Sequence, residues 1–102
     1  MEKEITSVVF SFIKHEFTTN ATAIYKKAID NYKKLDGCNG IEMFVNTESR
    51  TNFMIISKWK SIEYREKYLK SEFHTESINK LKKYRLKEPI FMNFENFHDE
   101  KS

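Results

Sequence analysis

Residues 41–59, IEMFVNTESRTNFMIISKW, contain two runs of alternating side chains separated by a short polar segment. In the first run, large apolar residues occupy every second position from Ile41 to Val45. In the second run, residues 52–59, both sets of alternate positions carry apolar side chains. A period of two is typical of β-strands, and the polar stretch 46–50 predicts a turn. An antiparallel hairpin is therefore expected at the centre of the fold.

The segment before this hairpin predicts a strand followed by a helix. Residues 5–17 are rich in Val, Phe and Ile on both alternating sides, which favours a strand with two apolar faces. Residues 18–20 supply candidate helix caps, and apolar residues then recur every three or four positions from 21 to 35. Gly37 is expected to end this amphipathic helix, because glycine readily adopts the left-handed conformation.

The segment after the hairpin predicts two helical stretches and a last strand. Ser61 is expected to cap the first stretch, whose apolar side is formed by Tyr64, Tyr68 and Leu69. A break at Ser71 precedes a second stretch, with an apolar stripe from Phe73 to Tyr84. Pro89 disfavours helix at the residue before it, and residues 90–97 predict a strand with two apolar faces.

The order strand, helix, strand, strand, helix, strand predicts one α+β domain over residues 1–102, with a core at about residues 5–97. This is the ferredoxin-like β-α-β-β-α-β arrangement, with an antiparallel sheet and helices on one side. Helices cover only one face of such a sheet, yet the strands are apolar on both. We therefore expect a homodimer that packs sheet face against sheet face. The alternative is an open sheet that binds a small ligand or nucleic acid.

Composition narrows the class of protein. The 102 residues include 18 basic and 15 acidic side chains, and this net charge of +3 does not demand a polyanionic partner. The single cysteine, Cys38, excludes an internal disulfide framework and a cysteine-based zinc cluster. No apolar run is long enough to span a membrane, and the charged first residues are unlike a signal peptide. A cytoplasmic protein without a metal site or a membrane partner is expected.

Two short segments carry a family resemblance: residues 36–42, DGCNGIE, and residues 59–64, WKSIEY. With residues 71–74, SEFH, they resemble the antibiotic biosynthesis monooxygenase family of the dimeric α+β barrel group. The resemblance covers residues 5–97. It implies a homodimer that oxidises a small aromatic or quinol compound with molecular oxygen and without a bound cofactor. The alternative is a non-catalytic dimeric ligand-binding or stress-related protein of the same fold.

The resemblance also implies a site. Trp59 corresponds to the tryptophan of the family and is expected to form the pocket, while His74 is the candidate base because histidine titrates near neutral pH. Tyr64, Tyr68 and Phe73 are expected to line the cleft and bind substrate. Each has a structural alternative: Trp59 as a core or interface anchor, His74 as a solvated or capping residue, and the three other aromatics as simple core.

Other activities fit the sequence less well. Heme-degrading relatives have an asparagine in the first strand and a histidine where this chain has Tyr68 and Leu69, and residues 5–17 contain no asparagine. No Gly-x-Gly-x-x-Gly dinucleotide motif is present. Residues 51–57 lack the glycines and basic residues of RNA-binding sheets. The basic residues at 80–87 are expected to form a solvated helix face, and His15 and His98 to lie on the surface.

Overall fold

The computed structural model describes residues 3–97. Its elements follow one another in the order β1 (Ile5–Phe12), a short 3-10 helix η1 (His15–Phe17), α1 (Thr18–Tyr32), β2 (Cys38–Val45), β3 (Asn52–Trp59), α2 (Ile62–Leu69), α3 (Glu72–Leu81) and β4 (Ile90–Glu95). The four strands form one antiparallel sheet in the order β2-β3-β1-β4. The predicted α+β, ferredoxin-like arrangement is therefore confirmed.

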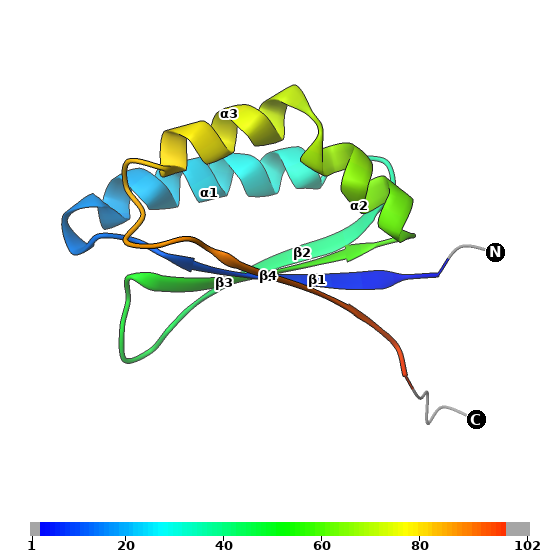
Figure 1. The fold of residues 1–102 in the computed structure, drawn as a ribbon, viewed down its shortest axis with the longest axis horizontal. Coiled ribbons are helices and arrows are strands. Elements are labelled where there is room, and N and C mark those ends of the chain that lie inside the picture. The colour runs from blue at the N-terminus through cyan, green and yellow to red at the C-terminus, as the bar shows by residue number, and fades with distance from the viewer. Residues whose placement is uncertain (1–2, 98–102) are drawn as a thin grey trace.

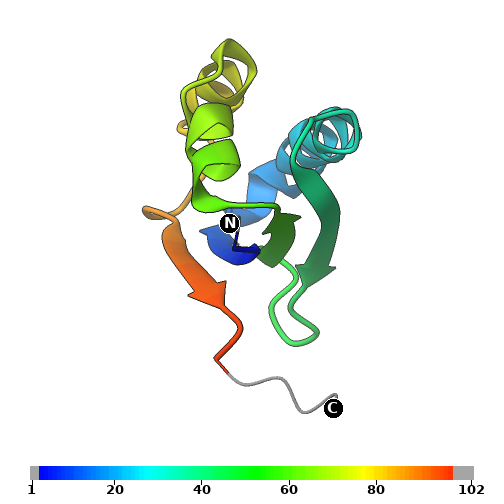
Figure 2. The same cartoon turned by 90° about the vertical axis from the view of Figure 1, so that its right-hand side faces the viewer.

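The helices form a single layer on one face of the sheet (Figure 1). Viewed along the strands, α1 stands over one half of the sheet and α2 with α3 over the other (Figure 2). No helix of residues 3–97 lies on the opposite face, which we call the open face. Within the same part of the chain, no helix is long and apolar enough to cross a membrane.

Buried aromatic residues gather at two places between the helices and the sheet. Near the start of α1, Tyr25 packs on Phe53 with ring centroids 5.2 Å apart, beside the buried Ile13. At the other end of the helix layer, Trp59 is completely buried and its ring lies 5.7 Å from that of Tyr68. The two clusters hold the helices on the sheet by burying large rings.

The two segments that carry the family resemblance meet at one corner. Gly37 has a φ of +88°, so it adopts the expected left-handed conformation, but it does so in the turn before β2 and does not end α1, which stops at Tyr32. Its carbonyl accepts a hydrogen bond of 2.8 Å from the N–H of Lys60, and Cys38 pairs with Trp59 across the sheet. The ring of Tyr64 packs so closely that a Cβ on Gly37 would clash with it. Residues 36–42 and 59–64 therefore build a single corner.

Several helices and strands begin or end at other residues than the sequence predicted, and two of the strands end where their partner strands begin. The strand expected over residues 5–17 ends at Phe12, opposite Asn52, where its partner β3 begins. Residues 15–17 form η1, so α1 starts at Thr18 and ends at Tyr32 rather than at residue 35. The last strand stops at Glu95, opposite Ile5.

The inner side of α2 also differs from the prediction. Leu69 is exposed, whereas Arg65 and Tyr68 are buried. Ser61 stands at the N-cap of α2 without a side-chain cap, but the hydroxyl of Ser71 does cap α3. Cys38 is the first residue of β2, and His98, expected on the surface, lies outside the described residues.

Candidate functional site

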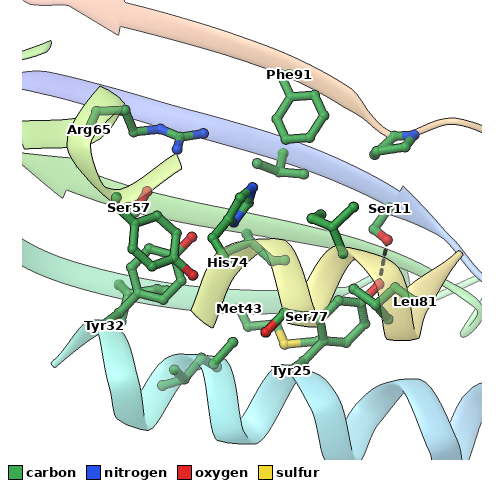
Figure 3. Close-up of a pocket in the computed structure, with 18 of the residues that line it drawn as sticks. Ser11, Tyr25, Tyr32, Met43, Ser57, Arg65, His74, Ser77, Leu81 and Phe91 are labelled. Carbon is green, nitrogen blue, oxygen red and sulfur yellow. Dashed lines mark hydrogen bonds between the residues drawn. The ribbon is translucent and has the colours of Figure 1, made fainter. Parts of the chain in front are cut away.

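A cavity lies between α1, α3 and the helix-covered face of the sheet (Figure 3). It holds about 810 Å³ of atom-free space, counting its open mouth. Apolar side chains such as Val9, Met43, Ile55 and Leu81 form most of its wall. A few polar groups converge on it, which is the usual composition of a small-molecule pocket.

Small residues on the central strands help to open this space. Ser7 and Ser11 of β1 and Ser57 of β3 are buried on the side that faces the helices. Ser11 and Ser57 line the cavity, where larger side chains would fill it. The hydroxyl of Ser11 shares a hydrogen bond with that of Tyr25, drawn as a dashed line in Figure 3.

His74 enters the cavity from the first turn of α3. Its backbone N–H donates to the hydroxyl of Ser71 at 3.2 Å, which fixes the start of the helix and leaves the imidazole free to face the cavity. The imidazole meets the ring of Tyr68 edge to face, with centroids 5.0 Å apart. Burial, assisted by the positive charge of Arg65, lowers the pKa of His74 below its ordinary value. The imidazole is therefore neutral at pH 7 and can accept a proton.

Arg65 lies on the inner side of α2 and is only 4% exposed. Its Nε–H donates to Ser7 Oγ at 2.7 Å, and Ser7 in turn donates to Asn93 Oδ1 at 2.5 Å. Its guanidinium carbon is 6.0 Å from the centroid of the Trp59 ring. Burial lowers the pKa of Arg65, but a guanidinium stays charged in proteins. Its terminal nitrogen Nη1 is buried and has no hydrogen-bond partner among the described residues.

Two tyrosines complete this end of the cavity. The rings of Tyr32 and Tyr68 are 4.5 Å apart, and both line the wall. Burial raises the pKa of both hydroxyls, so both are neutral at pH 7. They offer hydrogen-bonding groups without adding negative charge beside Arg65.

The five residues expected at the site fall into two groups. His74 and Tyr68 line the cavity, and Trp59 lies directly behind Tyr68, with its Nε1–H donating to Ser57 Oγ at 2.9 Å. Phe73 instead borders a separate hollow between α1 and α3 that does not include His74. Tyr64 packs on Gly37 and does not line the cavity.

Arg65 was not predicted from the sequence. The available signal is its spacing, since Ser61, Arg65 and Tyr68 lie four and three residues apart and therefore share one helix face. Among residues 3–97, no group of three His, Cys, Asp or Glu side chains could hold a metal ion.

The fold is that of solved proteins with a related description. A crystal structure of an antibiotic biosynthesis monooxygenase superimposes with a TM-score of 0.88 at 14% identity, covering 92% of this chain and 99% of that one. A protein of Nitrosomonas europaea, provisionally assigned the same name, has a TM-score of 0.88 at 7% identity over 96% and 94% of the two chains. A conserved protein of Bacteroides thetaiotaomicron, described as a possible oxidoreductase, gives 0.85 at 20% identity over 94% and 100%.

No protein-family model and no curated protein matches the chain. At these identities the similarity defines the fold, which is the fold of the antibiotic biosynthesis monooxygenases. The resemblance carried by residues 36–42 and 59–64 is thus confirmed at the level of architecture.

Proposed function

We propose that this protein is a cofactor-independent monooxygenase that oxidises a small aromatic or quinol-type compound with molecular oxygen. The observation that carries the proposal is that the neutral base His74 and the cation Arg65 face one aromatic-lined cavity (Figure 3). A base that removes a proton works best beside a positive group that stabilises the resulting anion. The proposed location is the cytoplasm, as expected from the sequence.

In the proposed reaction, Nε2 or Nδ1 of His74 accepts a proton from an acidic C–H or O–H group of the substrate. The substrate anion then transfers electrons to oxygen. For an activated ring methylene, one molecule of oxygen converts the methylene carbon into a carbonyl carbon and releases one molecule of water. One oxygen atom thus enters the product, the other leaves in water with the two methylene hydrogens, and all four electrons come from the carbon that is oxidised.

Three of the residues expected at the site have roles in this proposal. His74 is the catalytic base, and Tyr68 is a wall of the cavity against which an aromatic substrate stacks. Trp59 is a positioning residue, because its ring contacts those of Tyr32 and Tyr68 but does not line the cavity itself. Tyr64 and Phe73 have no place in the proposed site, because both lie outside the cavity.

We also propose a homodimer formed through the open face. Paired residues form an apolar row across the four strands of this face: Phe44, Met54, Phe10 and Ile90. Phe44, Ile90 and Met92 are exposed. Monomeric proteins rarely expose so continuous an apolar patch. Glu42 and Lys58 lie on the same face, so a two-fold axis can bring opposite charges of the two copies together.

Oxygen consumption tests the proposed reaction. Purified protein is mixed with a panel of anthrones and hydroquinones, and oxygen uptake and product are measured for the wild type and His74→Gln. We expect turnover by the wild type and at least a hundredfold loss in the variant, because general-base catalysis contributes about 10²–10⁴-fold. His15→Gln is the matched control, since His15 is exposed. Tight binding without conversion would instead support a non-catalytic ligand-binding protein.

A further inference from the structure

Arg65 is held rigidly at one end of the cavity. The helix that carries it begins directly after β3, and the side chain reaches across to β1, where Nε donates to Ser7. The hydrogen bond from Ser7 to Asn93 extends the contact to β4. Three elements therefore fix the guanidinium before any ligand binds.

The positive charge of Arg65 has no counter-ion among residues 3–97. None of the ion pairs within residues 3–97 involves it, and no described residue that lines the cavity is Asp or Glu. The other arginine of the cavity, Arg85, is paired with Glu88 at 2.8 Å. A buried charge without a partner is costly, and proteins normally pair such charges.

Only the Nε–H of the guanidinium makes a hydrogen bond to a described residue, and the N–H groups of its two terminal nitrogens are unused. Nη1 has no partner among the described residues, although buried polar groups are almost always hydrogen-bonded. Figure 3 shows the guanidinium of Arg65 and the ring of His74 directed toward the same space. An acceptor placed in the cavity beside the guanidinium would provide it with both a hydrogen-bond partner and a counter-ion.

The remaining wall of the cavity favours a particular kind of ring system in the ligand. Its wall consists mainly of aliphatic and aromatic side chains, including Ile29, Ile55, Tyr68 and Phe91. Such a wall favours a flat apolar ring system, and the neutral hydroxyls of the tyrosines do not repel an anion.

We infer that the cavity binds aromatic compounds that carry an anionic oxygen, either a carboxylate or an acidic phenolate, and that this oxygen accepts a hydrogen bond from the guanidinium of Arg65. The inference names the substrate class of the proposed monooxygenase and rests on that proposal for the choice of cavity. A hydrogen bond to a charged group contributes about 1.5–3 kcal/mol, which corresponds to about tenfold or more in affinity.

Binding of matched probes tests the inference. By isothermal titration calorimetry at pH 7, we expect 2-naphthoate to bind at least about tenfold more tightly than 2-naphthamide, which has the same shape without the charge. In a second arm, 4-nitrophenol is added and its absorption spectrum shows whether the bound species is phenol or phenolate. Preference for naphthoate points to a carboxylate as the natural group, and enrichment of nitrophenolate points to a phenolate.

Substitutions of arginine test whether Arg65 causes the preference for the anionic probe. We expect Arg65→Met to abolish it while naphthamide still binds, and Arg65→Lys to retain part of it because the positive charge remains. Lys26→Met is the matched control and is expected to keep the full preference, because Lys26 is exposed on α1 and does not line the cavity. Arg85→Met tests the other arginine of the cavity, which already has a carboxylate partner in Glu88. Circular dichroism verifies that each variant folds, and the probe pairs on the wild type decide the question if Arg65→Met does not fold.

The inference is wrong if the wild type prefers neither anionic probe, or if Arg85→Met rather than Arg65→Met removes the preference. Its failure is distinguishable from failure of the proposed function. Anion-selective binding without oxygen uptake keeps the role of Arg65 and removes the monooxygenase, whereas oxygen uptake from neutral substrates without such selectivity does the opposite.

Discussion

The described groups that line the cavity around His74 include no carboxylate that could stabilise the imidazole in its protonated form. Arg65 and Tyr68 face it from α2, Tyr32 lines the cavity from α1, and Arg85 follows α3. None of the described residues that line this cavity is a carboxylate. Burial therefore acts on His74 without opposition, and Arg65 adds repulsion, so the pKa of the imidazole lies below its ordinary value of 6.5.

This shift makes stability depend on pH. The unfolded chain binds a proton at His74 near pH 6.5, but the folded chain does so only at lower pH. Between the two pKa values the unfolded state holds more protons, so the free energy of unfolding falls as the pH is lowered from about 7 through this window. We expect His74→Gln to reduce this loss, measured by urea unfolding at pH 7 and pH 5.

His15→Gln is the control for this measurement, because His15 is exposed at the start of η1. It is expected to leave the pH dependence unchanged. If His15→Gln and His74→Gln alter the pH dependence equally, or if neither does, the assigned environment of His74 is wrong.

The buried ring of Trp59 leads to a second prediction at this scale. Trp59 has no exposed surface, and its Nε1–H is bonded to Ser57. We expect Trp59→Phe to lower the free energy of unfolding by about 1–3 kcal/mol, because it leaves a cavity and an unpaired buried hydroxyl. Phe97→Leu is the control and should change stability by no more than about 0.5 kcal/mol, since Phe97 is fully exposed. Equal effects of the two substitutions in a chemical denaturation series would contradict the assigned burial.

At the scale of elements, the alternation of residues 41–59 was sufficient to predict the hairpin, and helical periodicity was sufficient to predict α1. The ends of strands were harder to predict from the sequence, because they depend on partner strands that are far away in the sequence. β4 stops at Glu95 because β1 begins at its partner, Ile5. No pattern within residues 90–97 contains this information.

The candidate site was predictable to a similar degree. His74 and Tyr68 were expected at the site because histidine titrates near neutral pH and aromatic residues are usual in binding pockets. Both line the cavity, and their roles there stay a prediction. Arg65 was missed because a charged residue is normally assigned to the solvated side of a helix, and the short α2 has too few turns to define its inner face. Its burial became apparent only when Ser7, from a distant strand, was placed beside it.

The corner between α1 and β2 gives a prediction that belongs to these elements. Gly37 has a positive φ and lies against the ring of Tyr64, whereas a Cβ at Gly40 would meet no atom within 4 Å. We expect Gly37→Ala to lower the free energy of unfolding by about 2 kcal/mol or more, through the left-handed backbone and the clash. Gly40→Ala should be nearly neutral or slightly stabilising. Equal unfolding midpoints in urea for the two variants would contradict this description of the corner.

At the scale of the whole molecule, the uneven covering of the sheet is the main feature. One face carries all helices of the described chain (Figure 1). The other face presents apolar side chains to the surroundings. Phe94, Ile90 and Phe44 on that face are each more than two-fifths exposed. Their burial in a homodimer would remove this apolar area from water.

We expect the wild type to sediment as a dimer and Ile56→Lys to sediment as a monomer. Ile56 lies on the open face beside Val8 and opposite Glu42, so a lysine there can pair within one copy but disrupts apolar packing between copies. Lys26→Glu, on the exposed side of α1, is the control and should remain dimeric. A wild type that stays monomeric at high concentration in analytical ultracentrifugation would contradict the proposed interface.

The position of a bound aromatic anion is the most direct test of the central claim that the cavity beneath α1 and α3 is the functional site. The measurement is an NMR titration of isotopically labelled protein with 2-naphthoate, with side-chain signals of Arg65 and His74 assigned. We predict saturable shifts at both side chains and at Tyr32, with little change on the open face. Saturable shifts confined to open-face residues such as Phe10 and Met92, or no saturable shifts at all, would contradict the claim.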